Sequence, residues 1–99
     1  MLNITTEKNG NELTFKLNGR LDTVTAPELE TPVRNDLADV TNLIFDLSEL
    51  EYISSAGLRV LLLAQKTMNK QGKMIVKNVS EEINEIFEVT GFSDILTIE

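Results

Sequence analysis

Residues Leu43 to Ala64 read LIFDLSELEYISSAGLRVLLLA, and we expect the other elements of the chain to pack around them. The opening LIFDL is nearly continuous apolar sequence, which is typical of a central strand covered on both faces. From about Ser55 to Lys70, leucines recur at helical spacing. The stretch therefore predicts a buried strand, a short turn and a helix that begins at the adjacent residues Ser54 and Ser55.

The segments before this stretch predict two strands and a helix. LNITTE and LTFKL alternate apolar and polar residues, and the Asn-Gly pair between them is a strong hairpin signal. In DTVTAPELETPVRNDLADV, Thr25 with Glu28 three residues later is typical of a capping box at the start of a helix. Pro32 predicts either a kink in this helix or a restart with Thr31 as its cap.

The segments after it predict a strand, a helix and a final strand. KMIVKNV indicates a strand, Ser80 caps a helix that Gly91 ends, and ILTIE is expected to form an edge strand. The order β-β-α-β-α-β-α-β predicts an α/β fold with helices packed on a mixed sheet. We expect a single domain over residues 1–99, with four to five strands and three to four helices.

Composition argues against several classes of function. The 99 residues contain neither cysteine nor histidine, so we expect no thiolate chemistry and no zinc site. A net charge of −7 disfavours binding to nucleic acid and to anionic membranes. No apolar run is long enough to span a bilayer, and the N-terminus lacks the pattern of a signal peptide. We therefore expect a soluble cytoplasmic protein with no metal and no cofactor of its own.

Ser54 and Ser55 do not fit the patterns of catalytic serines. A nucleophile at a strand-to-helix turn has the pattern G-x-S-x-G and a base beside it, whereas here neither the first glycine nor any histidine is present. SSAGL also lacks the lysine and spaced glycines of a nucleotide-binding loop. Two interpretations remain: a helix N-cap, which spacing alone favours because caps are common, or a phosphate acceptor for a partner kinase.

Asp46 is expected to end the central buried strand, at the place where response-regulator receiver domains carry their phosphate acceptor. Those domains hold magnesium through acidic residues after the first strand, and neither TTEKNG nor LNGRLD supplies an acidic pair. We therefore interpret Asp46 as a hydrogen-bonding residue that orders the turn leading to the serines.

Three segments resemble a known family in order and spacing. GRLDTVTAPELE, NLIFDLSELEYISSAGLRVLL and GKMIVKNVSEEINEIFEVTGFSDIL are similar to the bacterial anti-sigma factor antagonists, which share the STAS domain. The resemblance runs from about Leu13 over nearly the whole remaining chain. It implies a single STAS domain that is an interaction module and not an enzyme.

The resemblance also implies the partners of this module. Members of the family bind an anti-sigma factor that is a serine kinase, and they are released when that kinase phosphorylates them. A metal-dependent serine phosphatase restores the unphosphorylated form. We expect the protein to act as a monomer. The alternative is a stand-alone STAS subunit of a transporter complex of the lipid-transport ATPase type, which has no phosphoserine switch.

Alignment with the family motif through Gly57-Leu58 places the phosphorylated residue at Ser55, with Ser54 as the alternative. Ser54 stands where the family has an acidic residue, which changes what a kinase meets beside the acceptor. The family's aspartate after the pattern G-x-L matches Asp22, and its aspartate at the end of the central strand matches Asp46. Both are expected near the acceptor. The residues expected to touch the partner are Asp22, Ser54, Ser55, Ala56, Gly57 and Arg59.

Arg59 is added to this set from its spacing. It lies four residues after Ser55, so the two side chains are neighbours on one face of the predicted helix. We expect Arg59 to meet a phosphate on Ser55 or an acidic patch on the partner. The alternative is a solvated arginine without a role, because isolated surface charges usually contribute little.

Overall fold

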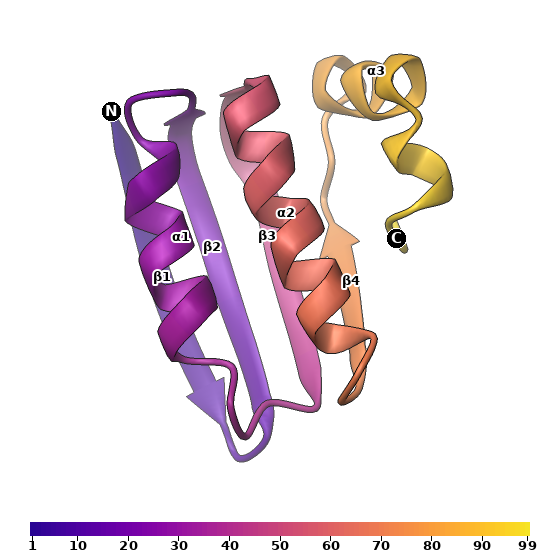
Figure 1. Ribbon diagram of the computed structural model, residues 1–99. Coiled ribbons are helices and arrows are strands. Elements are labelled where there is room, and N and C mark those ends of the chain that lie inside the picture. The colour runs from indigo at the N-terminus through magenta and orange to yellow at the C-terminus, as the bar shows by residue number, and fades with distance from the viewer.

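Four strands form one mixed sheet in the computed structural model, which describes all residues from 1 to 99 (Figure 1). They are β1 (Leu2–Asn9), β2 (Glu12–Leu21), β3 (Asn42–Ile53) and β4 (Lys73–Lys77), and they lie in that order across the sheet. β1 and β2 form the predicted antiparallel hairpin, whereas β2, β3 and β4 are parallel. The carboxyl ends of β2 and β3 therefore meet at the same edge of the sheet.

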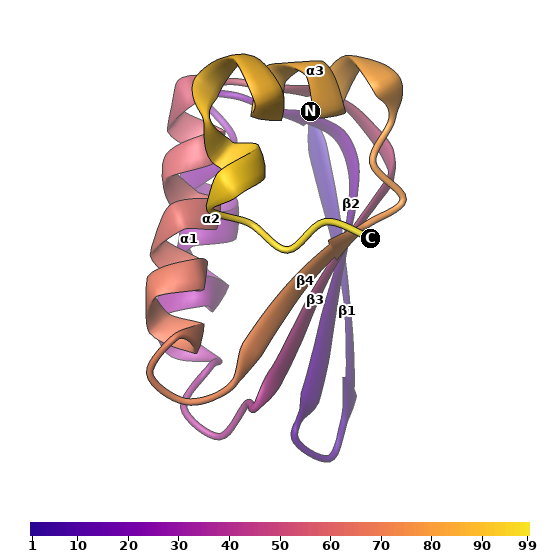
Figure 2. The same ribbon diagram turned by 90° about the vertical axis from the view of Figure 1, so that its right-hand side faces the viewer.

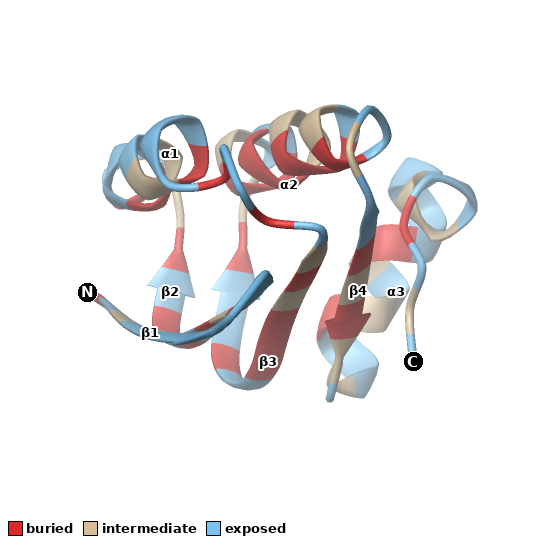
Figure 3. Cartoon of the chain, turned by 90° about the horizontal axis from the view of Figure 1, so that it is seen from below, coloured by how far each residue is buried: buried red, intermediate tan, exposed pale blue.

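Two helices cover one face of this sheet. α1 (Ala26–Asn35) and α2 (Ser55–Met68) lie side by side in a single layer, as Figures 2 and 3 show. α3 (Glu81–Thr90) lies across the end of the sheet beyond β4, followed by the short 3-10 helix η1 (Phe92–Asp94). The predicted α/β class, a mixed sheet with helices packed on it, is confirmed.

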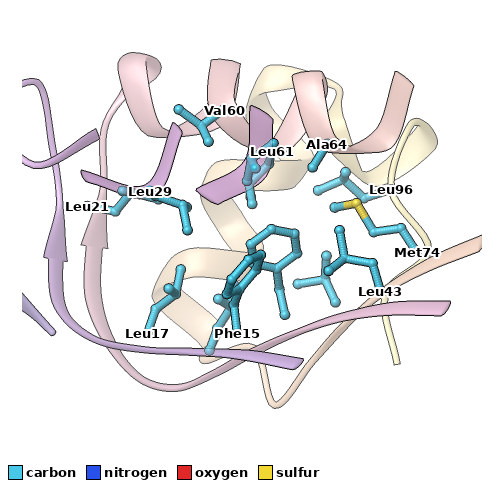
Figure 4. Close-up of a cluster of buried hydrophobic side chains, with 14 of the residues drawn as sticks. Phe15, Leu17, Leu21, Leu29, Leu43, Val60, Leu61, Ala64, Met74 and Leu96 are labelled. Carbon is cyan, nitrogen blue, oxygen red and sulfur yellow. The ribbon is translucent and has the colours of Figure 1, made fainter. Parts of the chain in front are cut away.

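The core fills the space between the sheet and the helices α1 and α2 (Figure 4). Phe15 of β2 and Phe45 of β3 are directly paired in the register, and their ring centroids are 5.5 Å apart. Leu29 of α1 and Leu61 of α2 are fully buried in the same core. These contacts fix how the two helices sit on the sheet, and so where each helix begins.

The opposite face of the sheet is not covered by a helix, which contradicts the prediction that the central strand is buried on both sides (Figure 3). On β2, exposed Lys16 and Arg20 alternate with buried residues, and Ile44 on β3 is only half-buried. A strand with one covered face can still read as an apolar run when a residue on its open side is apolar, as Ile44 is.

β3 continues to Ile53 and does not end near Asp46 as predicted. Its register with β2 shifts twice, and each shift inserts one extra residue into β3. The spacing of the buried residues changes as a result. Leu47, Leu50 and Ile53 are buried at intervals of three residues, whereas a regular strand buries every second residue. A strand interrupted by bulges loses its alternating pattern, which is why SELEY resembled a turn.

The capping box predicted for α1 is wrong, and so is one of the two alternatives at Pro32, the restart of the helix. The Thr25 hydroxyl makes no capping bond; it donates to the carbonyl of Arg20 (2.8 Å) and accepts from the N–H of Asp22 (2.9 Å). The helix also runs through Pro32 without a restart, and the Thr31 hydroxyl donates back to the carbonyl of Pro27 (3.1 Å). Pro27 in the first turn costs no hydrogen bond, because N–H groups there have no partner within the helix.

The expected final strand at ILTIE is reduced to a single parallel bridge between Val76 and Ile98. Gly91, with φ of 83°, ends α3, and η1 then turns the chain back toward β4. The bridge consists of two backbone hydrogen bonds, from the N–H of Val76 to the carbonyl of Thr97 and from the N–H of Glu99 to the carbonyl of Val76, both at 2.9 Å.

Phe45→Ala should lower the free energy of unfolding by about 3–5 kcal/mol, because it leaves a cavity opposite Phe15 in a fully buried site. Urea unfolding followed by circular dichroism measures this loss. Val89→Ala is the control: Val89 is 82% exposed, so its removal should change the free energy by no more than about 0.5 kcal/mol. A loss below about 1 kcal/mol for Phe45→Ala would contradict the packing described here.

Candidate functional site

The two serines lie at the sheet edge where β2 and β3 end and α1 and α2 begin (Figure 1). The N–H of Ser54 donates to the carbonyl of Leu21 at 2.9 Å, which ties the loop after β3 to the end of β2. The Leu21–Ile53 pair closes the parallel ladder just before this bond. The loops leading into α1 and α2 are therefore held side by side.

Ser54 and Ser55 have different roles at the start of α2. Ser54 is the N-cap residue: its backbone is extended, and its hydroxyl oxygen accepts from the N–H of Gly57 at 3.3 Å. Ser55 is the first helical residue, is exposed, and its hydroxyl makes no hydrogen bond within the chain. The cap interpretation therefore applies to Ser54, and it leaves the Ser55 hydroxyl free.

Gly57 allows α2 to begin in close contact with the sheet. A Cβ atom at this position would lie 2.7 Å from a side-chain carbon of Leu21 and 2.9 Å from one of Ile53. Both distances are shorter than real contacts of a Cβ atom, so only glycine fits. Gly57 is buried and determines how closely α2 approaches the sheet. The preceding Ala56 is half-buried and faces α1.

Asp22 organises the loop between β2 and α1. Its Oδ1 accepts from the N–H groups of Val24 and Thr25, both at 3.0 Å. The bond from the Thr25 N–H is the main cause that holds the pKa of Asp22 below its ordinary value. Asp22 therefore carries a negative charge at neutral pH, in the loop that the Ser54 bond holds beside α2.

Two features of this edge were not found from the sequence. The guanidinium of Arg20 lies 4.4 Å from the ring centroid of Tyr52, its partner on β3, and 3.9 Å from the Asp22 carboxylate. Val24 is 81% exposed at the tip of the loop that Asp22 holds. The first feature depends on the register between strands. The second has a signal in the sequence, which is an apolar residue in a predicted loop.

Arg59 is exposed and forms no ion pair within the chain. It lies one turn after Ser55 on α2, so the two residues share a helix face as the spacing predicted. The structure thus brings together Asp22, Ser54, Ser55, Ala56, Gly57 and Arg59 at one edge of the fold. We call this set the serine edge.

Asp46 does not belong to the serine edge. It pairs with Lys16 on β2, whereas Ile53 pairs with Leu21, so five residues of strand, about 17 Å, separate the two positions. Its Oδ1 accepts from the N–H of Ser48 and from the side-chain amide of Asn78, both at 3.0 Å. Asp46 therefore holds the first bulge of β3 against the chain leaving β4, and it does not order the turn at the serines.

Burial of the Asp46 carboxyl raises its pKa, but the hydrogen bonds from Asn78 and Ser48 outweigh burial and leave the pKa below its ordinary value. A carboxyl with a lowered pKa in the folded state stabilises the fold above its unfolded pKa. That stabilisation is lost as the pH falls through the folded-state value.

Asp46→Asn should therefore lose less stability than the wild type when the pH is lowered from 7 to about 3. Urea unfolding at both pH values measures this difference. Asn78→Gly is a matched variant: it removes one donor to Asp46 and suits the positive φ of 59° at this position, so it should shift the pH dependence in the same direction. An unchanged pH dependence in both variants would contradict the assigned role of these bonds.

Ser54→Ala should lower the free energy of unfolding by about 1 kcal/mol, because it removes the cap of α2. Ser55→Ala should change it by no more than about 0.5 kcal/mol, because its hydroxyl contacts no backbone donor. Urea unfolding of the two variants tests the assignment directly. An equal or larger loss in Ser55→Ala would show that Ser55 is the cap.

No helix of the structure is both long and apolar enough to cross a membrane. No group of three or more acidic side chains converges in a way that could hold a metal ion.

Comparison with known proteins places this chain in a family. The model of the STAS domain family matches residues 3–99. The anti-sigma-B factor antagonist of Staphylococcus aureus is 33% identical, over 98% of this chain and 92% of that protein. The chain belongs to the STAS-domain anti-sigma factor antagonist family.

Solved structures share the fold of this STAS domain. The anti-sigma factor antagonist from Mycobacterium paratuberculosis superposes with a TM-score of 0.89, at 24% identity, over 99% of this chain and 85% of that one. The phosphorylated form of the Bacillus cell fate determinant SpoIIAA gives a TM-score of 0.78, at 18% identity, over 98% of this chain and 91% of that one. At these identities the likeness concerns the fold alone.

Proposed function

We propose that this STAS protein is a phosphorylation-switched interaction module with Ser55 as its switch. While Ser55 is unphosphorylated, the serine edge binds an anti-sigma factor that is also a serine kinase. Phosphorylation of Ser55 releases the complex, and a metal-dependent serine phosphatase reverses it. The module is a cytoplasmic monomer and catalyses no reaction itself, because the kinase supplies both ATP and the chemistry.

The observation that carries this proposal is the difference between the two serine hydroxyls. Ser54 is engaged as the cap of α2, whereas the Ser55 hydroxyl is exposed and unbonded on a backbone fixed by the helix. In the reaction the Ser55 Oγ forms a bond to the γ-phosphorus of ATP, ADP leaves, and a base of the kinase takes the hydroxyl proton. An acceptor needs this accessibility, and an engaged cap lacks it.

The fold should tolerate a phosphate on Ser55, whereas a docked partner should not. A phosphate adds a charge of about −1.5 to −2, and the positive end of the α2 dipole favours a negative charge at this position. On the surface the same charge adds to the negative charge of Asp22, whose pKa the hydrogen bonds of its loop lower further. A partner that covers Ser55 with an apolar or acidic surface would have to bury this charge.

The serine edge also offers contacts that do not depend on phosphate. Val24 projects from the loop held by Asp22 and is suited to an apolar pocket on the partner. Burial of an exposed apolar side chain at an interface is favourable because it removes apolar surface from water. Val24 therefore joins Asp22, Ser55, Ala56 and Arg59 in the proposed docking surface.

The acceptor is tested by incubating the wild type, Ser54→Ala and Ser55→Ala with the anti-sigma kinase and ATP, followed by intact mass measurement. We expect one phosphate on the wild type and on Ser54→Ala, and none on Ser55→Ala. Ser54→Ala is the matched control, because it removes the adjacent hydroxyl but keeps the acceptor. Labelling of Ser55→Ala but not of Ser54→Ala would move the acceptor to Ser54, and labelling of both would reject a switch at this edge.

The effect of charge on docking is tested with Ser55→Asp and Ser55→Ala in a calorimetric titration with the same kinase. Ser55→Ala should bind like the wild type, whereas Ser55→Asp should weaken binding by about 2–5 kcal/mol, or less because aspartate carries less charge than phosphate. Equal affinity of both variants would favour a constitutive STAS subunit, as in a transporter complex, over a switch.

A further inference from the structure

A groove of about 580 Å³ runs between α1 and α2 on the face that points away from the sheet. It begins at the serine edge, where Thr23 and Ala56 line it, and extends along α2 to Lys66. Its apolar lining includes Pro27 of α1 and Leu62 and Leu63 of α2. The leucines are only partly buried, so the groove offers apolar surface to a partner.

The charge of the groove is opposite to that of the whole protein. The chain has a net charge of −7, yet three cations and a single carboxylate line the groove. Arg34 is paired with that carboxylate, Glu30, at 2.7 Å. Arg59 and Lys66, both exposed on α2, form no ion pair. The groove is thus a positive, partly apolar strip on an acidic molecule.

We propose that this groove binds an acidic amphipathic helix of the protein that docks at Ser55. The inference rests on the proposed function for the identity of the partner and adds a second, phosphate-independent contact to it. Arg59 and Lys66 are seven residues apart on α2, about 10.5 Å along its axis, and the two leucines lie between them. A helix with acidic residues at the same spacing and apolar residues between them matches both the charges and the apolar lining.

Charge also explains why an acidic ligand would select this place. The negative charge of the remaining surface repels an acidic partner, whereas the groove attracts it, so the encounter is oriented toward α1 and α2. Because the groove starts at Ala56, a partner held in it is positioned over Ser55. The groove contact would therefore present the acceptor hydroxyl to the kinase.

A synthetic helical peptide tests the groove without the kinase. The probe carries a pair of glutamates seven residues apart with two leucines between them, and a second peptide has lysines in place of the glutamates. Fluorescence anisotropy should show that the wild type binds the acidic peptide at least about tenfold more tightly than the basic one. Binding should weaken as salt is raised from about 0.05 M to about 0.5 M.

The decisive variants reverse the same amount of charge inside and outside the groove. Arg59→Glu/Lys66→Glu should weaken binding of the acidic peptide at least about tenfold relative to Lys70→Glu/Lys73→Glu, whose side chains do not line the groove. All four residues are exposed, so both variants should fold, and urea unfolding checks this. An equal loss in both variants, or equal binding of the two peptides, would overturn the proposal.

Two other occupants are distinguishable outcomes that would also overturn it. Binding of the wild type to phosphatidylglycerol vesicles, lost in Arg59→Glu/Lys66→Glu, would assign the groove to a membrane surface. Self-association in sedimentation velocity, lost in the same variant, would assign it to a second copy of the chain. Peptide binding without kinase labelling of Ser55 would reject the switch alone, whereas labelling without peptide binding would reject the groove alone.

Discussion

The hydrogen bond from the Ser54 N–H to the Leu21 carbonyl joins the ends of two parallel strands, and the serine edge depends on it. It places the first turn of α2 against Leu21 and Ile53, where the absence of a side chain at Gly57 allows close contact. The same strand end leads into the loop that Asp22 holds by accepting hydrogen bonds from the N–H groups of Val24 and Thr25. A change at either strand end would therefore move both loops together.

Backbone conformation gives two adjacent and chemically identical side chains different roles. An N-cap residue is extended, and its side chain turns back toward the free N–H groups of the first turn. Ser54 has this conformation, with φ of −97° and ψ of 175°. Ser55 is already helical, so its hydroxyl leaves the helix axis and meets solvent. The cap of α2 and the proposed switch can thus lie on different residues without a change of residue type.

Local patterns predicted most of the elements, and tertiary register explains what they missed. The hairpin, the start of α2 at the serines and the cap at Ser80 follow from residues close in sequence. The length of β3, the position of Asp46 and the contact between Arg20 and Tyr52 depend on two bulges that only the pairing with β2 defines. Thr25 has the spacing of a capping box, but its hydroxyl is used by the carbonyl of Arg20 across the loop. The apolar alternation of ILTIE predicted a strand, but the tail makes a single bridge to β4 at Ile98.

The bulges of β3 also limit how this protein can evolve. They determine whether the side chain of Ile53 points toward the helices or away from them, and hence the side of the sheet on which the chain leaves β3. Between Asp46 and Ile53, replacement of one exposed side chain by another leaves the direction of the Ile53 side chain unchanged. Insertion or deletion of a single residue in this segment would reverse which side chains face the helices, and it would turn the serines away from α1. The exposed positions of this segment should therefore vary among related chains while its length stays constant.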